Sequence, residues 1–157
     1  MQLPDHVDSS NRIPVSGDAP TQGFAGSTLH TEQLMLVPIR RCDYVSNRAL
    51  IMSDRARYIG GPFEEGRAWW TFTTMNGHWN LRGFGLFSVI MRANDQLMGF
   101  IGNWWPVDFP EHEIGWTLLA PAEGMDIAFE AAREVQRHSF HTLGWSTAVS
   151  YIHRENT

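Results

Sequence analysis

The chain has 157 residues, 43% of them hydrophobic, which is enough for one domain with a hydrophobic core and well above the content of a disordered chain. Its net charge is −5, and all 12 basic residues are arginines in no obvious cluster, which argues against nucleic acid as the main partner. No apolar run approaches the length that spans a membrane, no secretory signal is evident, and the single cysteine indicates a reducing cytoplasm.

The first thirty residues differ in composition from the rest. Residues 1–30 are rich in Pro, Ser, Gly, Asp and Asn and show no sustained hydrophobic period, so we expect a flexible tail. One domain then covers residues 31–157. A short apolar run at residues 34–39 predicts the first strand, and residues 42–52 predict a helix. Cys42 at its start is interpreted as a small packing residue, because nothing around it indicates an activated nucleophile.

A second helix is expected after the break at Gly60-Gly61-Pro62, with Pro62 in its first turn. Apolar side chains at spacings of three and four give it one hydrophobic face, formed by Trp69, Phe72, Met75 and Trp79. Such a stripe could line a binding pocket, but packing against a sheet is the favoured interpretation.

Two apolar runs, residues 84–91 and 97–105, are joined by Ala93-Asn94-Asp95-Gln96, a sequence typical of a tight turn. They predict a β-hairpin whose strands are buried on both faces of a sheet. The tryptophans that end the second run, Trp104 and Trp105, could form one wall of a binding site or cap the core.

A strand followed by a helix is expected next, at residues 112–119 and from about residue 123 to Gly144. Gly115 in the strand could mark a bulge or a close backbone approach. The turn between them contains Gly124, and free N–H groups at such a helix start suit a phosphate or another anion. Residues 147–152 predict a further strand.

The run EIGWTLLAPAEGMDIAFEAA, residues 113–132, resembles the acetyl-coenzyme A signature of the GNAT N-acetyltransferase superfamily, particularly its RimJ/RimL-like branch. The likeness extends to TEQLMLVPIRRCDY, GFIGNWW and TAVSYIHRENT, so it covers residues 31–157. It implies an α/β (α+β) fold, in which helices flank a mixed, mostly antiparallel central sheet. The family continues with another helix and two strands that this sequence does not encode, so the resemblance implies a C-terminally truncated domain.

The resemblance implies that the donor substrate is acetyl-CoA, without a metal. The coenzyme would contact backbone N–H groups of the strand and the turn, together with an asparagine near the end of the chain: Leu118, Leu119, Glu123, Gly124, Met125, Asp126, Ile127, Ala128 and Asn156. Two positions depart from the family pattern, because Glu123 stands where Gln or Arg is usual and Asp126 where a glycine is usual. A carboxylate about 5 Å from a phosphate costs about 3 kcal/mol before screening, so we expect an impaired anion site. Alternatively, Asp126 stabilises the first helical turn.

The implied function is transfer of an acetyl group to a primary amine of a protein N-terminus or a small molecule. Glu113 is the candidate general base, acting directly or through water. Its neighbour His112 would face the other side of the strand. Exposure of both side chains to solvent at the strand mouth is an equally good interpretation. Another pair of histidines, His138 and His141, could share a metal, although two surface histidines are favoured.

The alternative function is a catalytically silent GNAT-like module for binding or assembly, with an impaired CoA site. The predicted strand at residues 147–152 would be an exposed edge, which favours pairing with a second copy in a homodimer.

Overall fold

The computed structural model describes residues 28–156, so nearly all of the predicted tail lies outside the described residues. An antiparallel sheet of five strands runs through the centre in the order β1-β2-β3-β4-β5. The strands are β1 Leu29–His30, β2 Leu34–Pro38, β3 Leu86–Met91, β4 Gln96–Trp104 and β5 Glu113–Leu118. This sheet confirms the predicted fold class, and β1 lies within the last residues of the segment expected to be a tail.

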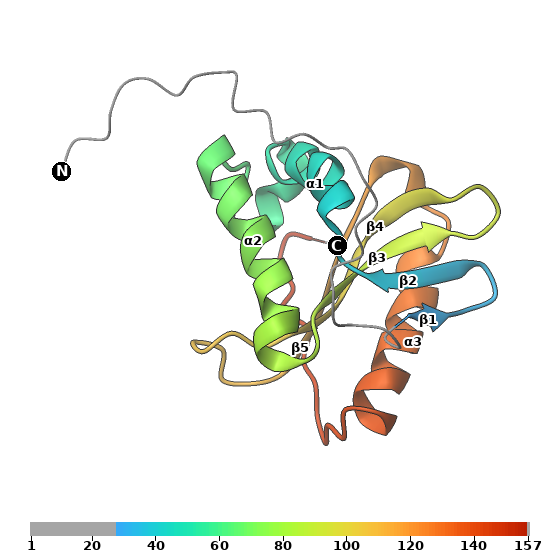
Figure 1. Ribbon diagram of the computed structural model, residues 1–157. Helices are drawn as coiled ribbons and strands as arrows, with labels where there is room; N and C mark the ends of the chain where they lie inside the picture. The colour runs from blue at the N-terminus through green and yellow to red at the C-terminus, as the bar shows by residue number, and fades with distance from the viewer. Residues whose placement is uncertain (1–27, 157) are drawn as a thin grey trace.

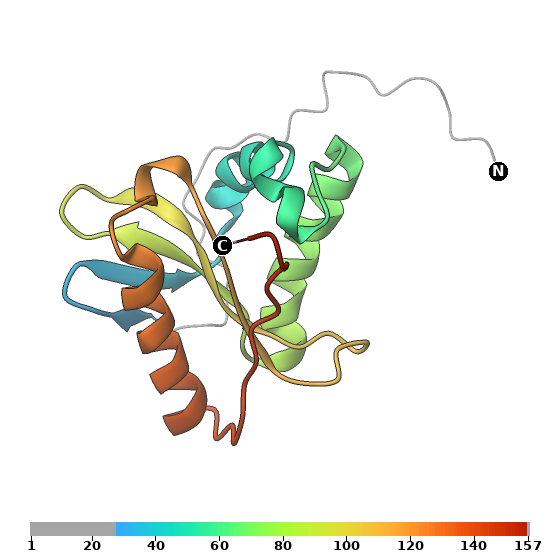
Figure 2. The same ribbon diagram turned by 180° about the vertical axis from the view of Figure 1, so that it is seen from behind.

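Helices cover both faces of the sheet (Figures 1 and 2). The helix pair α1 and α2 lies on one face and α3 on the other. The helical elements are η1 Arg41–Asp43, α1 Tyr44–Ile51, η2 Asp54–Ile59, α2 Glu65–Arg82, η3 Ala120–Ala122 and α3 Ile127–His141. In α3 the buried residues recur every four positions, at Ile127, Ala131, Val135 and Ser139, which gives one stripe against the sheet.

The second helix starts later than the sequence predicts. Pro62 lies ahead of α2, which begins at Glu65 after an extended residue at Glu64. Its apolar stripe divides in two: Phe72 and Trp79 are buried in the core, whereas Trp69 is 41% exposed. The Trp79 indole N–H also donates to the Leu86 carbonyl at 2.7 Å, so the C-terminal half of α2 is fixed to β3.

The predicted hairpin is present, and both of its strands are buried along most of their length. The irregularity in this region lies in β4 and not at Gly115. Val89 pairs with Gly99 and Ile90 with Leu97, so Met98 is the extra residue of a bulge. Gly115 pairs regularly with Gly102, and a Cβ at Gly115 would meet only the Glu113 carboxyl, at 3.5 Å.

The close backbone approaches occur in β4 instead. A Cβ at Gly102 would lie 2.4 Å from the Gly85 carbonyl oxygen, and a Cβ at Gly99 would lie 2.5 Å from the Thr117 carbonyl oxygen. Both distances are far below van der Waals contact. Glycine at these positions therefore allows β4 to pack this closely between its neighbours.

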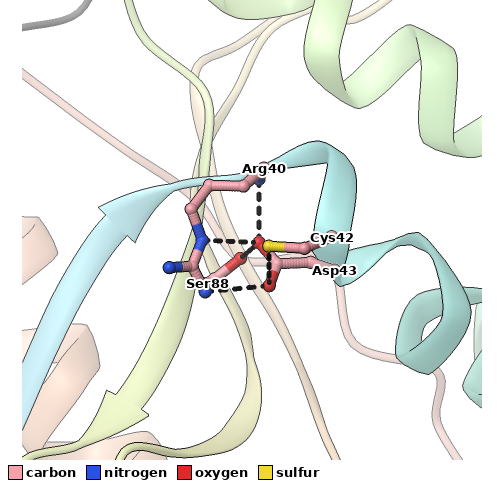
Figure 3. Close-up of polar contacts among 4 residues, drawn as sticks. All are labelled: Arg40, Cys42, Asp43 and Ser88. Carbon is pink, nitrogen blue, oxygen red and sulfur yellow. Dashed lines mark hydrogen bonds and ion pairs between the residues drawn. The ribbon is translucent and has the colours of Figure 1, made fainter. Parts of the chain in front are cut away.

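A buried carboxylate joins the start of α1 to the sheet. Asp43 is 4% exposed and accepts hydrogen bonds from the Arg40 backbone N–H at 2.8 Å and from the Ser88 hydroxyl at 2.7 Å. The Arg40 guanidinium lies 3.0 Å from its other oxygen, so the charge is paired (Figure 3). This contact ties the turn after β2 to β3.

Cys42 is exposed, which contradicts its interpretation as a buried packing residue. Partial burial and the neighbouring Asp43 carboxylate raise the pKa of the thiol. A thiol that is harder to ionise is a poorer nucleophile, so the structure gives Cys42 no catalytic role.

The segment after α3 does not form the predicted strand at residues 147–152. It runs parallel to β5 and makes one isolated bridge, between Glu113 and Val149. In this bridge the Ile114 N–H donates to the Val149 carbonyl at 2.9 Å, and the Val149 N–H donates to the His112 carbonyl at 2.9 Å. The described residues after Val149 form no further bridge with β5, so no strand covers most of the outer edge of β5.

We predict that Gly102→Ala lowers the free energy of unfolding by about 1–3 kcal/mol, because the new methyl group would push against the Gly85 backbone. The matched control is Gly77→Ala in α2, where a Cβ meets nothing within 4 Å. This control should be neutral or stabilise by up to about 1 kcal/mol, since alanine favours helix. Urea unfolding followed by circular dichroism measures both. Equal stability of the two variants would contradict the close approach.

Candidate functional site

The outer edge of β5 carries backbone groups that point away from the sheet. The Leu119 N–H donates toward β4, to the Met98 carbonyl at 2.9 Å, whereas the Ile114 N–H donates outward. Direction alternates from residue to residue in an antiparallel strand, so the N–H groups of Trp116 and Leu118 also point outward. Of the two leucines expected to contact the coenzyme, Leu118 therefore directs its N–H to the open edge, whereas the Leu119 N–H is already used within the sheet.

The turn between β5 and α3 presents a second set of N–H groups. The first hydrogen bond of α3 runs from the Glu130 N–H to the Asp126 carbonyl at 3.0 Å. The N–H groups of Ile127, Ala128 and Phe129 precede it and have no acceptor within the helix. Just before them, the side chains of residues 123–126 are exposed. The N-terminus of α3 therefore has donors and a dipole of the sign that suits an anion, next to an exposed turn.

Asp126 adopts a left-handed backbone conformation with φ of 56°. This is the conformation that glycine adopts most readily, and it costs an aspartate about 1 kcal/mol. The Asp126 side chain makes no capping hydrogen bond, so it contributes only its charge to the first turn of α3. The position therefore keeps a backbone shape suited to glycine and adds a carboxylate to it.

Glu123 is paired with a residue that the sequence did not indicate. One guanidinium nitrogen of Arg55, in η2, lies 2.6 Å from the Glu123 carboxylate and donates to the Leu118 carbonyl at 3.2 Å. The ion pair places a cation at the turn and offsets the charge of Glu123. No local pattern could reveal Arg55, because it lies 68 residues from its partner.

A cavity of about 820 Å³ lies along the open edge of β5. Its walls come from β5, from the exposed side of α2, from η2 and from the last described residues of the chain. Asn156 lies in this wall, whereas the turn at residues 123–128 lies outside it. Asn156 thus shares the lining of this cavity with Glu113.

Glu113 is in the wall of this cavity, and its neighbour His112 is not. The His112 ring stacks on Trp145 with centroids 4.2 Å apart and contacts Trp105 at 4.3 Å. Burial raises the pKa of the Glu113 carboxyl, and a hydrogen bond from the Tyr151 backbone N–H at 3.3 Å partly offsets this effect. A carboxylate whose pKa is raised holds an accepted proton more firmly and is a better base.

The aromatic candidates divide between the cavity and the core. Trp104 lines the cavity, and Trp105 packs beneath the Arg82 guanidinium, which lies 4.4 Å from its ring centroid. From the predicted stripe of α2 only Met75 reaches the cavity. Trp70, which is 70% exposed and falls outside that stripe, lines it as well. The sequence signal for Trp70 was its place on the polar side of an amphipathic helix.

Metal ligands do not gather in the part of the chain that the structure describes, where no three His, Cys, Asp or Glu side chains form a group able to hold an ion. His138 is partly buried, which lowers the pKa of its ring, and its ring lies edge-on to Phe87. His141 is exposed. Within residues 28–156 no helix is both long and apolar enough to cross a membrane.

Comparison with known proteins finds similarity to acetyltransferases. The family model described as the acetyltransferase (GNAT) domain matches residues 33–157. An acetyltransferase from Agrobacterium tumefaciens is 32% identical, with 88% of this chain and 81% of that chain covered and a TM-score of 0.79. A GNAT-family acetyltransferase from Bacillus anthracis is 21% identical, with 78% and 72% covered and a TM-score of 0.65.

A more distant structure is that of spermidine N-acetyltransferase from Vibrio cholerae in complex with CoA and spermine. It is 17% identical, with 80% of this chain and 75% of that chain covered and a TM-score of 0.64, so it shows likeness of fold. No curated protein matches the chain significantly.

We predict that Glu113→Gln stabilises the protein at pH 7. A raised pKa means that ionising Glu113 is harder in the folded than in the unfolded chain, so the wild type loses stability as pH rises through the folded pKa. The amide cannot ionise, and the advantage of the variant should vanish at about pH 4, near the ordinary glutamate pKa. Urea unfolding at both pH values measures it.

The control for this experiment is Glu32→Gln, which removes the same charge at an exposed site, where substitutions usually change stability by less than about 0.5 kcal/mol. A Glu113→Gln variant less stable than the wild type at pH 7 would contradict the assigned environment.

Proposed function

Because the chain belongs to the GNAT acetyltransferase family, and so to the acyltransferases, we propose that it transfers the acetyl group of acetyl-CoA to a primary amine. The acceptor amine would belong to a protein N-terminus or a small molecule. The order of the sequence motifs further supports the RimJ/RimL-like branch. The observation that carries the proposal is the outer edge of β5, where Glu113 lines the same cavity as Trp116, whose backbone N–H points outward.

The turn before α3 and the edge of β5 would hold the two parts of the coenzyme. The N–H groups at the start of α3 suit its pyrophosphate, because they are free donors at the positive end of a helix. The outward N–H groups of Trp116 and Leu118 suit the amide-bearing pantetheine arm, since they can pair with it as a strand would. The same groups lie close to Glu113 in sequence and share its strand.

Glu113 would act as the general base. It takes the proton that the amine loses as its nitrogen bonds to the acetyl carbon and the carbon–sulfur bond breaks. The proton then passes to the departing sulfur, which leaves as a neutral thiol, so the charges balance. An outward N–H of β5 would polarise the acetyl carbonyl during this step.

The charges around the turn support a working but weakened anion site. Arg55 lies 2.6 Å from Glu123 and offsets its charge, so Asp126 is the carboxylate of the turn that opposes a phosphate. Glu123 thus repels a bound phosphate less than the sequence suggested. Asp126 still opposes phosphate binding.

We predict that Asp126→Gly tightens acetyl-CoA binding by roughly tenfold, because it removes a carboxylate from the anion site after partial screening. The matched control is Asp95→Gly. Asp95, in the β3–β4 turn, has the same φ of 56°, so this change removes an equal charge and equal backbone strain elsewhere. Isothermal titration calorimetry measures both dissociation constants.

Tightening in both variants, or in neither, would show that the charge at position 126 does not act on the coenzyme. Absence of acetyl-CoA binding to the wild type and to both variants would support the silent-module alternative.

We predict that Glu113→Gln lowers kcat/KM for acetyl transfer by about 10²–10⁴-fold, because the amide cannot accept the proton. In the wild type, kcat/KM should rise with pH as Glu113 ionises, at a pH above the ordinary glutamate range because its pKa is raised. In the variant, kcat/KM should no longer rise with pH in this range. Glu32→Gln, at an exposed position outside the lining of the cavity, is the control and should retain the wild-type profile.

A further inference from the structure

The lining of the cavity beside Glu113 carries information about the acceptor. We propose that the acceptor is a primary amine on an aromatic or similarly apolar body, and not a polyamine. The inference rests on the proposed function, because it takes Glu113 as the group that receives the amine. It concerns the part of the cavity that lies between β5 and the helices α2 and η2.

Aromatic rings from separate segments line this part of the cavity. They are Tyr58 in η2, Phe63 ahead of α2, Trp70 in α2, Trp104 at the end of β4, and Phe109 and Tyr151 in the loops beside β5. Rings supply apolar contact area with little conformational freedom to lose, and their faces also attract a cation. An aromatic amine would use both properties.

The charges of the lining oppose a polyamine. Glu113 is the one carboxylate among the described residues that line the cavity, and the same lining contains the Arg67 guanidinium. A second or third ammonium entering the cavity would lose its water without gaining a partner. One carboxylate matches one amine, and the remaining surface matches an apolar body.

Trp104 gives the cavity a rigid wall. Its ring stacks on His78 with centroids 4.6 Å apart and 20° between the planes. His78 is itself fixed, since Nδ1 lies 2.8 Å from the Phe84 carbonyl oxygen and Nε2 accepts the Trp105 backbone N–H at 3.1 Å. A ring held in this way is ready to receive a ligand without prior rearrangement.

Trp70 provides the exposed wall and the means of testing the inference. It is 70% exposed, whereas its neighbour Trp69 turns to the other side of α2 and contacts Tyr44 edge-on at 5.3 Å. Trp69 does not line the cavity. The two adjacent tryptophans thus form a matched pair, one inside the binding surface and one outside it.

The first experiment measures binding of amines by isothermal titration calorimetry, which requires no turnover. The probes are 2-phenylethylamine and tryptamine, with n-butylamine as an aliphatic amine of equal charge and spermidine as the polyamine. We expect the aromatic amines to bind at least about tenfold more tightly than n-butylamine and spermidine. Equal or tighter binding of spermidine, or binding of none of the four, would overturn the proposal.

The second experiment repeats the titrations with Trp70→Ala and Trp69→Ala. Trp70→Ala should weaken tryptamine binding by about fivefold or more and leave n-butylamine unchanged, while Trp69→Ala should change neither. Unaltered tryptamine binding in Trp70→Ala would overturn the proposal, and circular dichroism checks that both variants are folded.

These results separate the inference from the proposed function. Selective binding of aromatic amines without acetyl-CoA binding or acetyl transfer would contradict the proposed function and leave the cavity assignment intact. Transfer from acetyl-CoA to polar amines or polyamines in preference to aromatic ones would contradict the cavity assignment and leave the proposed function intact.

Discussion

The hydrogen bonds between β5 and β4 use every second backbone group of β5 and direct the others outward, and the site depends on this alternation. It places the Leu119 N–H inside the sheet and the Leu118 N–H on the open edge. The pleat of the strand has the same period of two, so of two adjacent side chains Glu113 meets the cavity and His112 does not. Glycines in β4 hold this arrangement, because larger residues at positions 99 and 102 would separate the strands.

Much of the fold could be predicted from periodicity alone. The hairpin formed by β3 and β4 and the helix α3 follow from their apolar patterns, because burial on a sheet imposes those patterns directly. The predictions were wrong at positions where contacts between distant segments override the local preference of a residue. Pro62 is a good helix starter but lies before α2, and the bulge formed at Met98 without a local signal, since it depends on how β3 and β4 pair.

In the candidate site, too, some features could be predicted from the sequence and others could not. The turn before α3 and the opposite faces of His112 and Glu113 follow from local properties of the chain and could be predicted, whereas the register that commits the Leu119 N–H to β4 could not. Arg55 could not, since its ion pair joins segments 68 residues apart. Trp70 was missed for another reason: a hydrophobic pattern identifies the buried face of α2, whereas the cavity is lined by its solvent-facing side.

The two ends of α2 are attached very differently. Near its C-terminus, the His78 and Trp79 side chains bind carbonyl oxygens at the start of β3, whereas most side chains of its first turns are exposed. The N-terminal half is held to α1 instead, because Ala68 is fully buried against that helix and Glu65 pairs with Arg48 at 2.9 Å. Arg67 and Trp70, on the solvent-facing side of this half, line the cavity. A molecule that enters therefore passes exposed side chains, whose motions are faster than those of a packed helix.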